Sequence, residues 1–151
     1  MANLIKWSAT LGTYTTLIAG ASTAPTLKNL ANGATKIGNT ITGNRNQYCA
    51  LELKVRGASA FVAGGYVGFW WINSADDTNY EDGSDSVQSQ RPQDAIFPVG
   101  ALSTQQVITL WNVLLPPFNF KPLIINSTGQ AFTNTDNENI LSYRPYNDEI
   151  Q

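Results

Sequence analysis

The sequence predicts an all-β protein, a jelly-roll-like β-sandwich of about eight antiparallel strands in a single domain. Its 151 residues suit one domain with one hydrophobic core. No window of eleven or more residues shows a sustained 3.6-residue hydrophobic period, so helix should be scarce. Instead, short segments of alternating apolar and polar residues recur between turn residues, which is typical of sandwiches and barrels.

Three segments have the clearest strand patterns. In residues 48–56, apolar residues alternate with Ala50, Glu52, Lys54 and Arg56, which is the two-residue period of a half-buried strand. Residues 66–72 and 107–114 are largely apolar on both faces, so we expect both to be central strands. Shorter strands are expected at residues 26–30, 34–37, 96–99, 123–126, 130–132 and 140–143.

Turn residues separate these strands. Asn32-Gly33 is the favoured dipeptide of a type I′ turn, so it predicts a hairpin between residues 26–30 and 34–37. The only helical element that the pattern allows is a single turn near residues 103–106. No repeat, linker or domain boundary is visible. We therefore expect a sandwich domain over residues 26–151, preceded by residues 1–25 as an N-terminal arm or first strand.

A strand with two apolar faces in a small domain is either covered on both sides or lends one face to another chain. For residues 66–72 we favour the second interpretation, a contact between subunits. Apolar pairs in the N-terminal segment would serve an arm in the same way. The candidate interface residues are Tyr66, Trp70, Ile72, Trp111, Leu17 and Ile18.

The charge content excludes some partners. Charged residues make up 13% of the chain, against a usual share of about 25%. Nine basic residues stand against eleven acidic ones without any run of Lys or Arg, so no nucleic acid partner is expected. No stretch approaches 18 apolar residues, and the N-terminus lacks a signal-peptide core. We therefore expect neither a membrane span nor Sec-dependent export.

The residues needed for most enzyme chemistry are missing. The chain has no His, the usual general base near neutral pH and the commonest ligand of zinc and copper. Cys49 is the only cysteine, and its apolar neighbours predict a buried, inert thiol. No carboxylate pair or phosphate-binding loop is recognisable. We predict that the protein is not an enzyme and has no catalytic residues, cofactor or metal site.

One loop is rich in carboxylates, and oxygen-rich loops can hold calcium. Counted from Asp77, Gly83 falls at position seven instead of six, and Gln88 stands at twelve, where an EF-hand has Glu. We favour a solvated loop that joins two strands, with a calcium-dependent lectin or enzyme as the alternative. The acidic residues are Asp76, Asp77, Glu81, Asp82 and Asp85.

Aromatic residues are numerous enough for a sugar-stacking surface, although aromatic pairs belong more often to the core. The Asn-rich composition would also supply hydrogen-bond partners for a glycan, since the chain has 15 Asn. Glycan binding is therefore retained as an alternative function. The four tryptophans are Trp7, Trp70, Trp71 and Trp111.

Several turn and strand motifs follow one another over residues 45–147. They are Gly64-Gly65-Tyr66-Val67, Asp77-Thr78-Asn79-Tyr80-Glu81-Asp82-Gly83, Phe97-Pro98, Leu115-Pro116-Pro117, Asn126-Ser127-Thr128-Gly129-Gln130-Ala131-Phe132 and Tyr143-Arg144-Pro145-Tyr146-Asn147. In order and spacing they resemble the motifs of small jelly-roll virion structural proteins of tailed bacteriophages, of the capsid decoration or cement type. Residues before Arg45 carry no such resemblance.

The resemblance implies a protein made in the host cytoplasm that assembles on the capsid surface of the virion. It would stabilise the head through self-association as a homo-oligomer, with a trimer as one candidate, and through contacts with the major capsid protein. No catalytic residues carry over. The alternative is a glycan-binding module of a phage tail fibre or baseplate.

Overall fold

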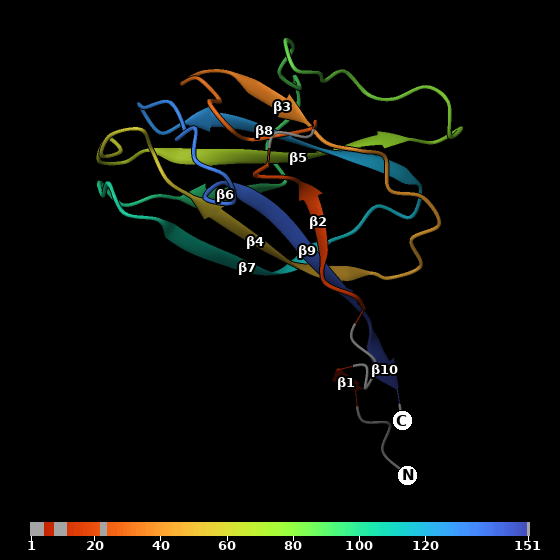
Figure 1. Cartoon of the computed structure of the whole chain (residues 1–151). Helices are drawn as coiled ribbons and strands as arrows, with labels where there is room; N and C mark the ends of the chain where they lie inside the picture. The colour runs from red at the N-terminus through yellow and green to blue at the C-terminus, as the bar shows by residue number, and fades with distance from the viewer. Residues whose placement is uncertain (1–4, 8–11, 22–23, 151) are drawn as a thin grey trace.

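The computed structural model describes residues 5–7, 12–21 and 24–150 (Figure 1). Regular secondary structure in these residues is all β, and the helical turn that the pattern allows near residues 103–106 is not formed. No helix long and apolar enough to cross a membrane occurs in this part of the chain. The strands are β1 (Ile5–Trp7), β2 (Thr15–Ile18), β3 (Thr35–Ile37), β4 (Tyr48–Val55), β5 (Tyr66–Ser74), β6 (Ala95–Pro98), β7 (Gln106–Leu114), β8 (Asn119–Ser127), β9 (Ile140–Tyr146) and β10 (Asp148–Ile150).

The strands pair from the two ends of the chain inward. β1 pairs with β10, β2 with β9, β3 with β8, β4 with β7 and β5 with β6, all antiparallel. The chain is thus one long hairpin, and further β4–β9 and β5–β8 pairs fold it into two sheets of order β2-β9-β4-β7 and β3-β8-β5-β6 (Figure 1). This nested order is a jelly roll, which confirms the predicted fold class.

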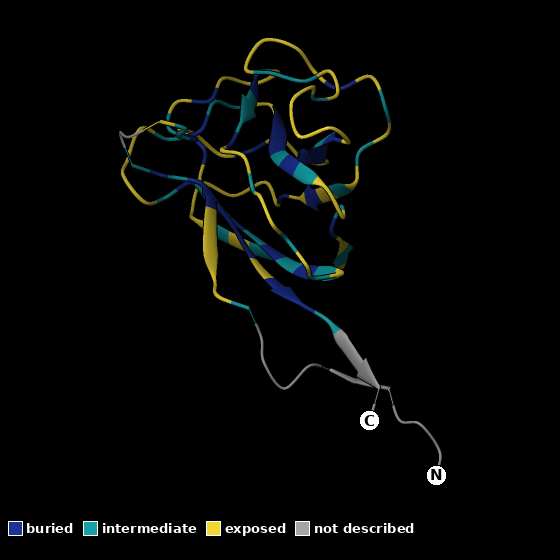
Figure 2. Ribbon diagram, turned by 90° about the vertical axis from the view of Figure 1, so that its right-hand side faces the viewer, coloured by how far each residue is buried: buried dark blue, intermediate teal, exposed yellow. Residues whose placement is uncertain are grey.

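The main core lies between the two sheets, where buried residues line the facing sides of the strands (Figure 2). In β4 every second residue is fully buried, as the alternation predicts, including Leu51 and Leu53. From β5, the Trp71 ring meets Phe69 and Phe120 edge-on, with centroids 4.5 and 4.7 Å apart. Each such side chain contributes about 1.5–3 kcal/mol or more when removed from water.

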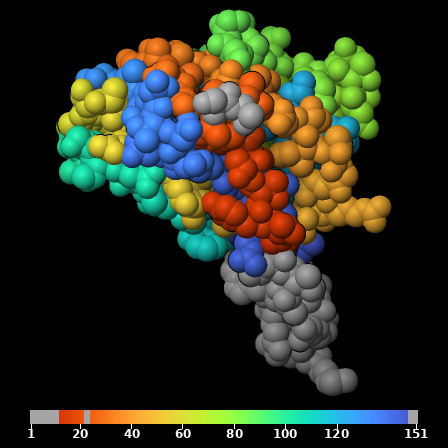
Figure 3. Space-filling model, in the orientation of Figure 1, coloured from red at the N-terminus to blue at the C-terminus, as the bar shows by residue number. Residues whose placement is uncertain are grey.

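The outer face of β5 is covered by the chain itself. The loop of residues 75–94 folds back over the β3-β8-β5-β6 sheet and forms the raised green part of the surface in Figure 3. Under it lies a second apolar cluster of Trp70, Ile72, Leu123 and Ile125. The Trp70 indole donates to a backbone carbonyl of the loop, that of Arg91, at 2.9 Å. Strand β5 is therefore covered on both sides within one chain.

Two of the predicted strands are not formed. Residues 26–30 and 130–132 each contribute one isolated bridge, Ala19 with Thr26 and Gly57 with Phe132. The predicted type I′ hairpin is wrong as well, because β3 pairs with β8 rather than with the preceding segment. The Asn32 side chain instead accepts a hydrogen bond from the Gly129 N–H at 2.8 Å. Long-range pairing has overridden the local turn signal.

The N-terminal segment contributes to the sandwich. Strand β2, within the segment expected to be an arm or first strand, is an edge strand of the β2-β9-β4-β7 sheet. Strand β1 pairs with β10 away from the two main sheets (Figure 1). Residues 1–4, 8–11 and 22–23 of the expected arm lie outside the described residues.

Asn126 on β8 is a buried polar crosslink between loops. Its Nδ2 donates to the carbonyls of Leu30 and Gln130 at 2.9 and 2.8 Å. Its Oδ1 accepts from the Thr128 N–H and hydroxyl at 3.1 and 2.7 Å. All these partners would lose a hydrogen bond if the amide were removed.

We expect Asn126→Ala to lower the free energy of unfolding by about 2–4 kcal/mol, because it leaves several buried polar groups unpaired. Urea denaturation followed by tryptophan fluorescence measures the change. Asn39→Ala, at an exposed position, is the control and should stay within about 0.5 kcal/mol of the parent. Equal stability of the two variants would contradict the proposed role of Asn126.

Candidate functional site

Four of the six predicted interface residues are covered by their own chain. Trp70 and Ile72 lie beneath the loop of residues 75–94, and Leu17 and Ile18 lie in the main core. Their exposed fractions are 4% or less. Other apolar residues of the same chain already cover these side chains, so assigning these four residues to a subunit interface is wrong.

The remaining two predicted residues, Tyr66 and Trp111, are separated. Tyr66 is partly buried at the start of β5, whereas Trp111 lies on β7 in the other sheet. Trp111 is 71% exposed, the largest fraction among the exposed large apolar side chains of the described residues. It is the predicted residue that offers apolar surface to a partner.

Trp111 belongs to what we call the β7 edge surface, formed by Val107, Trp111 and Leu114. These side chains are 56%, 71% and 63% exposed. Strand β7 pairs only with β4 among the described strands, so the expectation that it is central is wrong. Residues 95–120 contain no Asp, Glu, Lys or Arg. A long apolar edge without charged residues lacks the usual protection against pairing with another chain.

A β-bulge places the three side chains on one face. Cys49 pairs with Val113 and Leu51 with Leu110, so two residues of β7 stand opposite one residue of β4. Asn112 in the bulge has a φ of 58°, and its N–H donates to the Tyr146 hydroxyl at 2.9 Å. That hydroxyl donates back to the Asn112 side-chain oxygen at 2.7 Å. The extra residue shifts the alternation, so Leu114 joins Trp111 on the exposed face.

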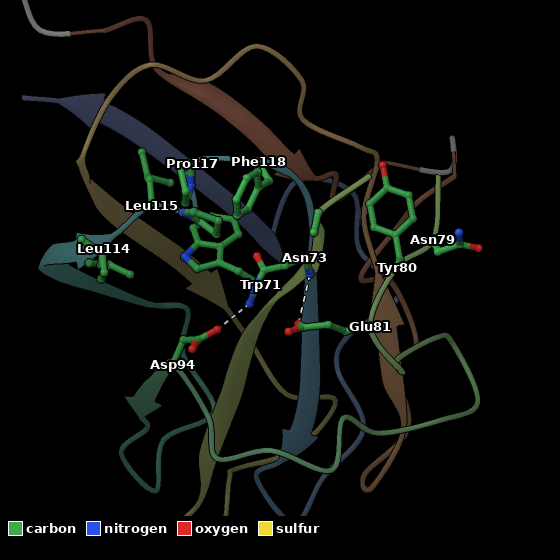
Figure 4. A pocket seen from close by; sticks show the side chains of 13 residues that line it. Trp71, Asn73, Asn79, Tyr80, Glu81, Asp94, Leu114, Leu115, Pro117 and Phe118 are labelled. Atoms are coloured by element: carbon green, nitrogen blue, oxygen red, sulfur yellow. Dashed lines mark hydrogen bonds between the residues drawn. The ribbon is translucent and has the colours of Figure 1, made fainter. Parts of the chain in front are cut away.

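A second feature is a cleft of about 700 Å³ between the loop of residues 75–94 and the segment that follows β7 (Figure 4). Trp71 and Asn73 on β5 line it, together with Glu81 and Asp94. The opposite wall is apolar and consists of Val113, Leu114, Leu115, Pro116, Pro117 and Phe118. Ala75, Asn79 and Tyr80 complete the lining. Sequence reasoning did not identify this cleft, because its two sides are distant in the chain.

Along the part of β5 that lines the cleft, carboxylate side chains accept the backbone N–H groups that a neighbouring strand would otherwise pair. Strand β6 pairs with β5 only as far as Phe69. Beyond that point the Trp71 N–H donates to Asp94 Oδ2 at 2.7 Å and the Asn73 N–H donates to Glu81 Oε2 at 3.1 Å (Figure 4). Arg91 bonds both Asp94 oxygens, at 2.6 and 2.8 Å, and these bonds raise the pKa of Arg91. The two carboxylates therefore have a structural role, because they satisfy backbone donors at the edge of the sheet.

The acidic loop is organised by local hydrogen bonds. The Asp76 carboxylate accepts the N–H groups of Asn79 and Thr78 at 2.7 and 3.0 Å, and these bonds hold the pKa of Asp76 well below its usual range. The Asp85 carboxylate forms a salt bridge with Lys36 on β3, with Oδ2 and Nζ 2.5 Å apart. No group of three potential metal-binding side chains occurs among the described residues. The calcium interpretation gains no support from this geometry.

Cys49 lies in the main core with no exposed surface, as its apolar neighbours predict. Burial raises the pKa of its thiol to about 12. The nucleophilic thiolate is therefore scarce near neutral pH.

We expect Asn112→Val to cost about 2–3 kcal/mol of stability, because a β-branched residue is strained at positive φ and the bond from Tyr146 is lost. Asn112→Gly should cost only about 1 kcal/mol, since Gly tolerates this φ. Urea denaturation of both variants tests the order. Equal stability of Asn112→Val and Asn112→Gly would contradict the left-handed backbone conformation at Asn112.

Because the Cys49 thiol is buried and protonated, we expect no reaction with Ellman's reagent at pH 8 in the native protein. One equivalent should react after unfolding in guanidinium chloride, which serves as the positive control. Rapid labelling of the native state would place the thiol at the surface and contradict its position in the core.

No protein-family model matches this chain, and no curated protein sequence matches it. The features of the structure that bear on function are the β7 edge surface and the cleft.

Proposed function

We propose that this chain is a bacteriophage virion structural protein, a capsid decoration or cement protein that assembles through its β7 edge surface. The observation that carries the proposal is the combination of an unpaired strand edge with the exposed side chains of Val107, Trp111 and Leu114. Such a surface gains free energy when a second copy or another protein covers it. The partners are a second copy of the chain and the major capsid protein on the virion surface.

The size of the surface favours assembly on a lattice. A fully buried Trp contributes 150–250 Å², so the exposed part of Trp111 offers on the order of 100–180 Å². At roughly 25 cal/mol per Å² its burial supplies about 3–4 kcal/mol. Association costs about 4 kcal/mol or more in lost freedom of motion. Pairwise contact through this residue alone is therefore weak, whereas many copies on one capsid reinforce one another.

The composition of the chain fits the same role. The chain carries few charges, and its polar residues are mainly uncharged Asn, Gln, Ser and Thr. Neighbouring copies with a net charge of only −2 repel one another little. The nested jelly roll also leaves β7 at a sheet edge, where a partner strand has access.

We expect the weight-average mass of the protein to rise with concentration in sedimentation velocity, because copies associate through β7. The double variant Trp111→Ser with Leu114→Ser should remain monomeric over the same range while keeping its thermal stability. Val87→Ser, which changes an exposed apolar residue in the loop of residues 75–94, is the matched control and should associate like the parent.

The capsid contact is tested by co-sedimentation with heads assembled from the major capsid protein of the same phage. We expect the parent and Val87→Ser to bind and the double variant to bind at least tenfold more weakly. A parent protein that stays monomeric at high concentration and does not bind the heads would overturn the proposed function.

A further inference from the structure

We propose that the cleft between β5 and the segment after β7 is a binding site for an uncharged sugar. The site rests on the cleft of about 700 Å³ and on two polar atoms in it that lack partners. A volume of this size lies within the range of about 300–1,000 Å³ that is usual for small-molecule pockets. The proposal does not depend on the role of the β7 edge surface in assembly, although Leu114 belongs both to that surface and to the cleft lining.

The first unpartnered atom is the indole nitrogen of Trp71. This side chain is 2% exposed, and its Nε1 has no hydrogen-bond partner among the residues that the structure describes. The neighbouring Trp70 differs, since its Nε1 donates to the Arg91 carbonyl at 2.9 Å. Buried indole N–H groups normally find an acceptor. The indole N–H of Trp71 therefore lacks an acceptor in the part of the protein that the structure describes, and a ligand in the cleft that its ring lines would supply one (Figure 4).

The second unpartnered atom is the side-chain oxygen of Asn73, two residues further along the same face of β5. Its Oδ1 is buried and has no partner within the described part of the chain. This oxygen accepts hydrogen bonds, whereas the Trp71 nitrogen donates one. A hydroxyl group is both donor and acceptor, so a ligand with neighbouring hydroxyls satisfies both atoms.

The other residues that line the cleft indicate the shape, polarity and charge of the ligand. Pro117 and Phe118 present apolar surface opposite these polar atoms (Figure 4). A sugar ring combines apolar C–H faces with a rim of hydroxyls and so matches both walls. The charged residues that line the cleft are Glu81 and Asp94. Arg91 pairs with both carboxylates, so the three side chains together carry one net negative charge. This charge disfavours an anionic ligand and favours an uncharged sugar over sialic or uronic acids.

This site differs from the aromatic surface considered from the sequence. Trp70 is buried on the opposite face of β5, and Trp111 lies on the outer face of the other sheet. The side chain of Trp7 is outside the described residues. The sugar-binding tryptophan of the proposal is Trp71.

The test follows the indole N–H signals of the four tryptophans in proton–nitrogen NMR spectra. The probes are the methyl glycosides of glucose, galactose, mannose and N-acetylglucosamine, titrated into the full-length protein. We expect at least one of them to shift the Trp71 signal in a saturable manner and to leave the Trp111 signal unchanged. Methyl glucuronide and sialic acid should produce at least tenfold weaker responses.

Two variants remove the polar contacts with small changes in volume. Trp71→Phe deletes the indole donor, and Asn73→Leu deletes the acceptor; each should weaken binding of the same glycoside at least tenfold in calorimetry. Trp70→Phe removes the neighbouring indole donor, which faces away from the cleft, and should leave the affinity within twofold. Folding of every variant is checked by thermal denaturation.

Three results would overturn the proposal. They are no shift of the Trp71 signal with any glycoside at high millimolar concentration, unchanged affinity in a folded Asn73→Leu variant, and a Trp71 shift caused by an uncharged proline-rich peptide but by none of the sugars. The last result would assign the cleft to a peptide partner. Loss of self-association in a Trp111→Ser single variant, which leaves the cleft lining unchanged, affects none of these measurements.

Discussion

The burial of both faces of β5 is the constraint on which the rest of the structure depends. One face carries Phe69 and Trp71 into the core between the sheets, and the other carries Trp70 and Ile72. Apolar surface on both sides of a strand is stable only when something covers each side. The opposite sheet covers the first face, and the loop of residues 75–94 covers the second.

The same loop also completes the edge of the sheet. Where β6 ends, Asp94 and Glu81 accept backbone N–H groups of β5, and Arg91 holds Asp94 in place. These contacts satisfy donors that would otherwise be exposed at the edge or left unpaired. Because the loop runs past the end of the sandwich, it forms one wall of the cleft. Glu81, one of the carboxylates of the acidic loop, thus has a structural role.

The two sheets differ in whether the chain covers the apolar side chains on their outer faces. The β3-β8-β5-β6 sheet is covered by a loop, whereas Val107, Trp111 and Leu114 of β7 in the other sheet remain exposed. The bulge at Asn112 increases this difference, because it turns Leu114 outward instead of into the core. One outer apolar surface is thus covered by the chain's own loop, and the other is left open. The free energy that burial of apolar surface can still supply is therefore concentrated at β7.

The sequence by itself determined the fold class, the positions of seven strands and the burial of Cys49, because these follow from local alternation and composition. It also showed that both faces of residues 66–72 are apolar, but not which segment covers the outer face. Residues 66–72 and 107–114 have similar patterns, yet one is central and the other is an edge strand. Sheet position, the covering loop and the cleft were decided by tertiary structure, because each depends on contacts between residues that are distant in the chain.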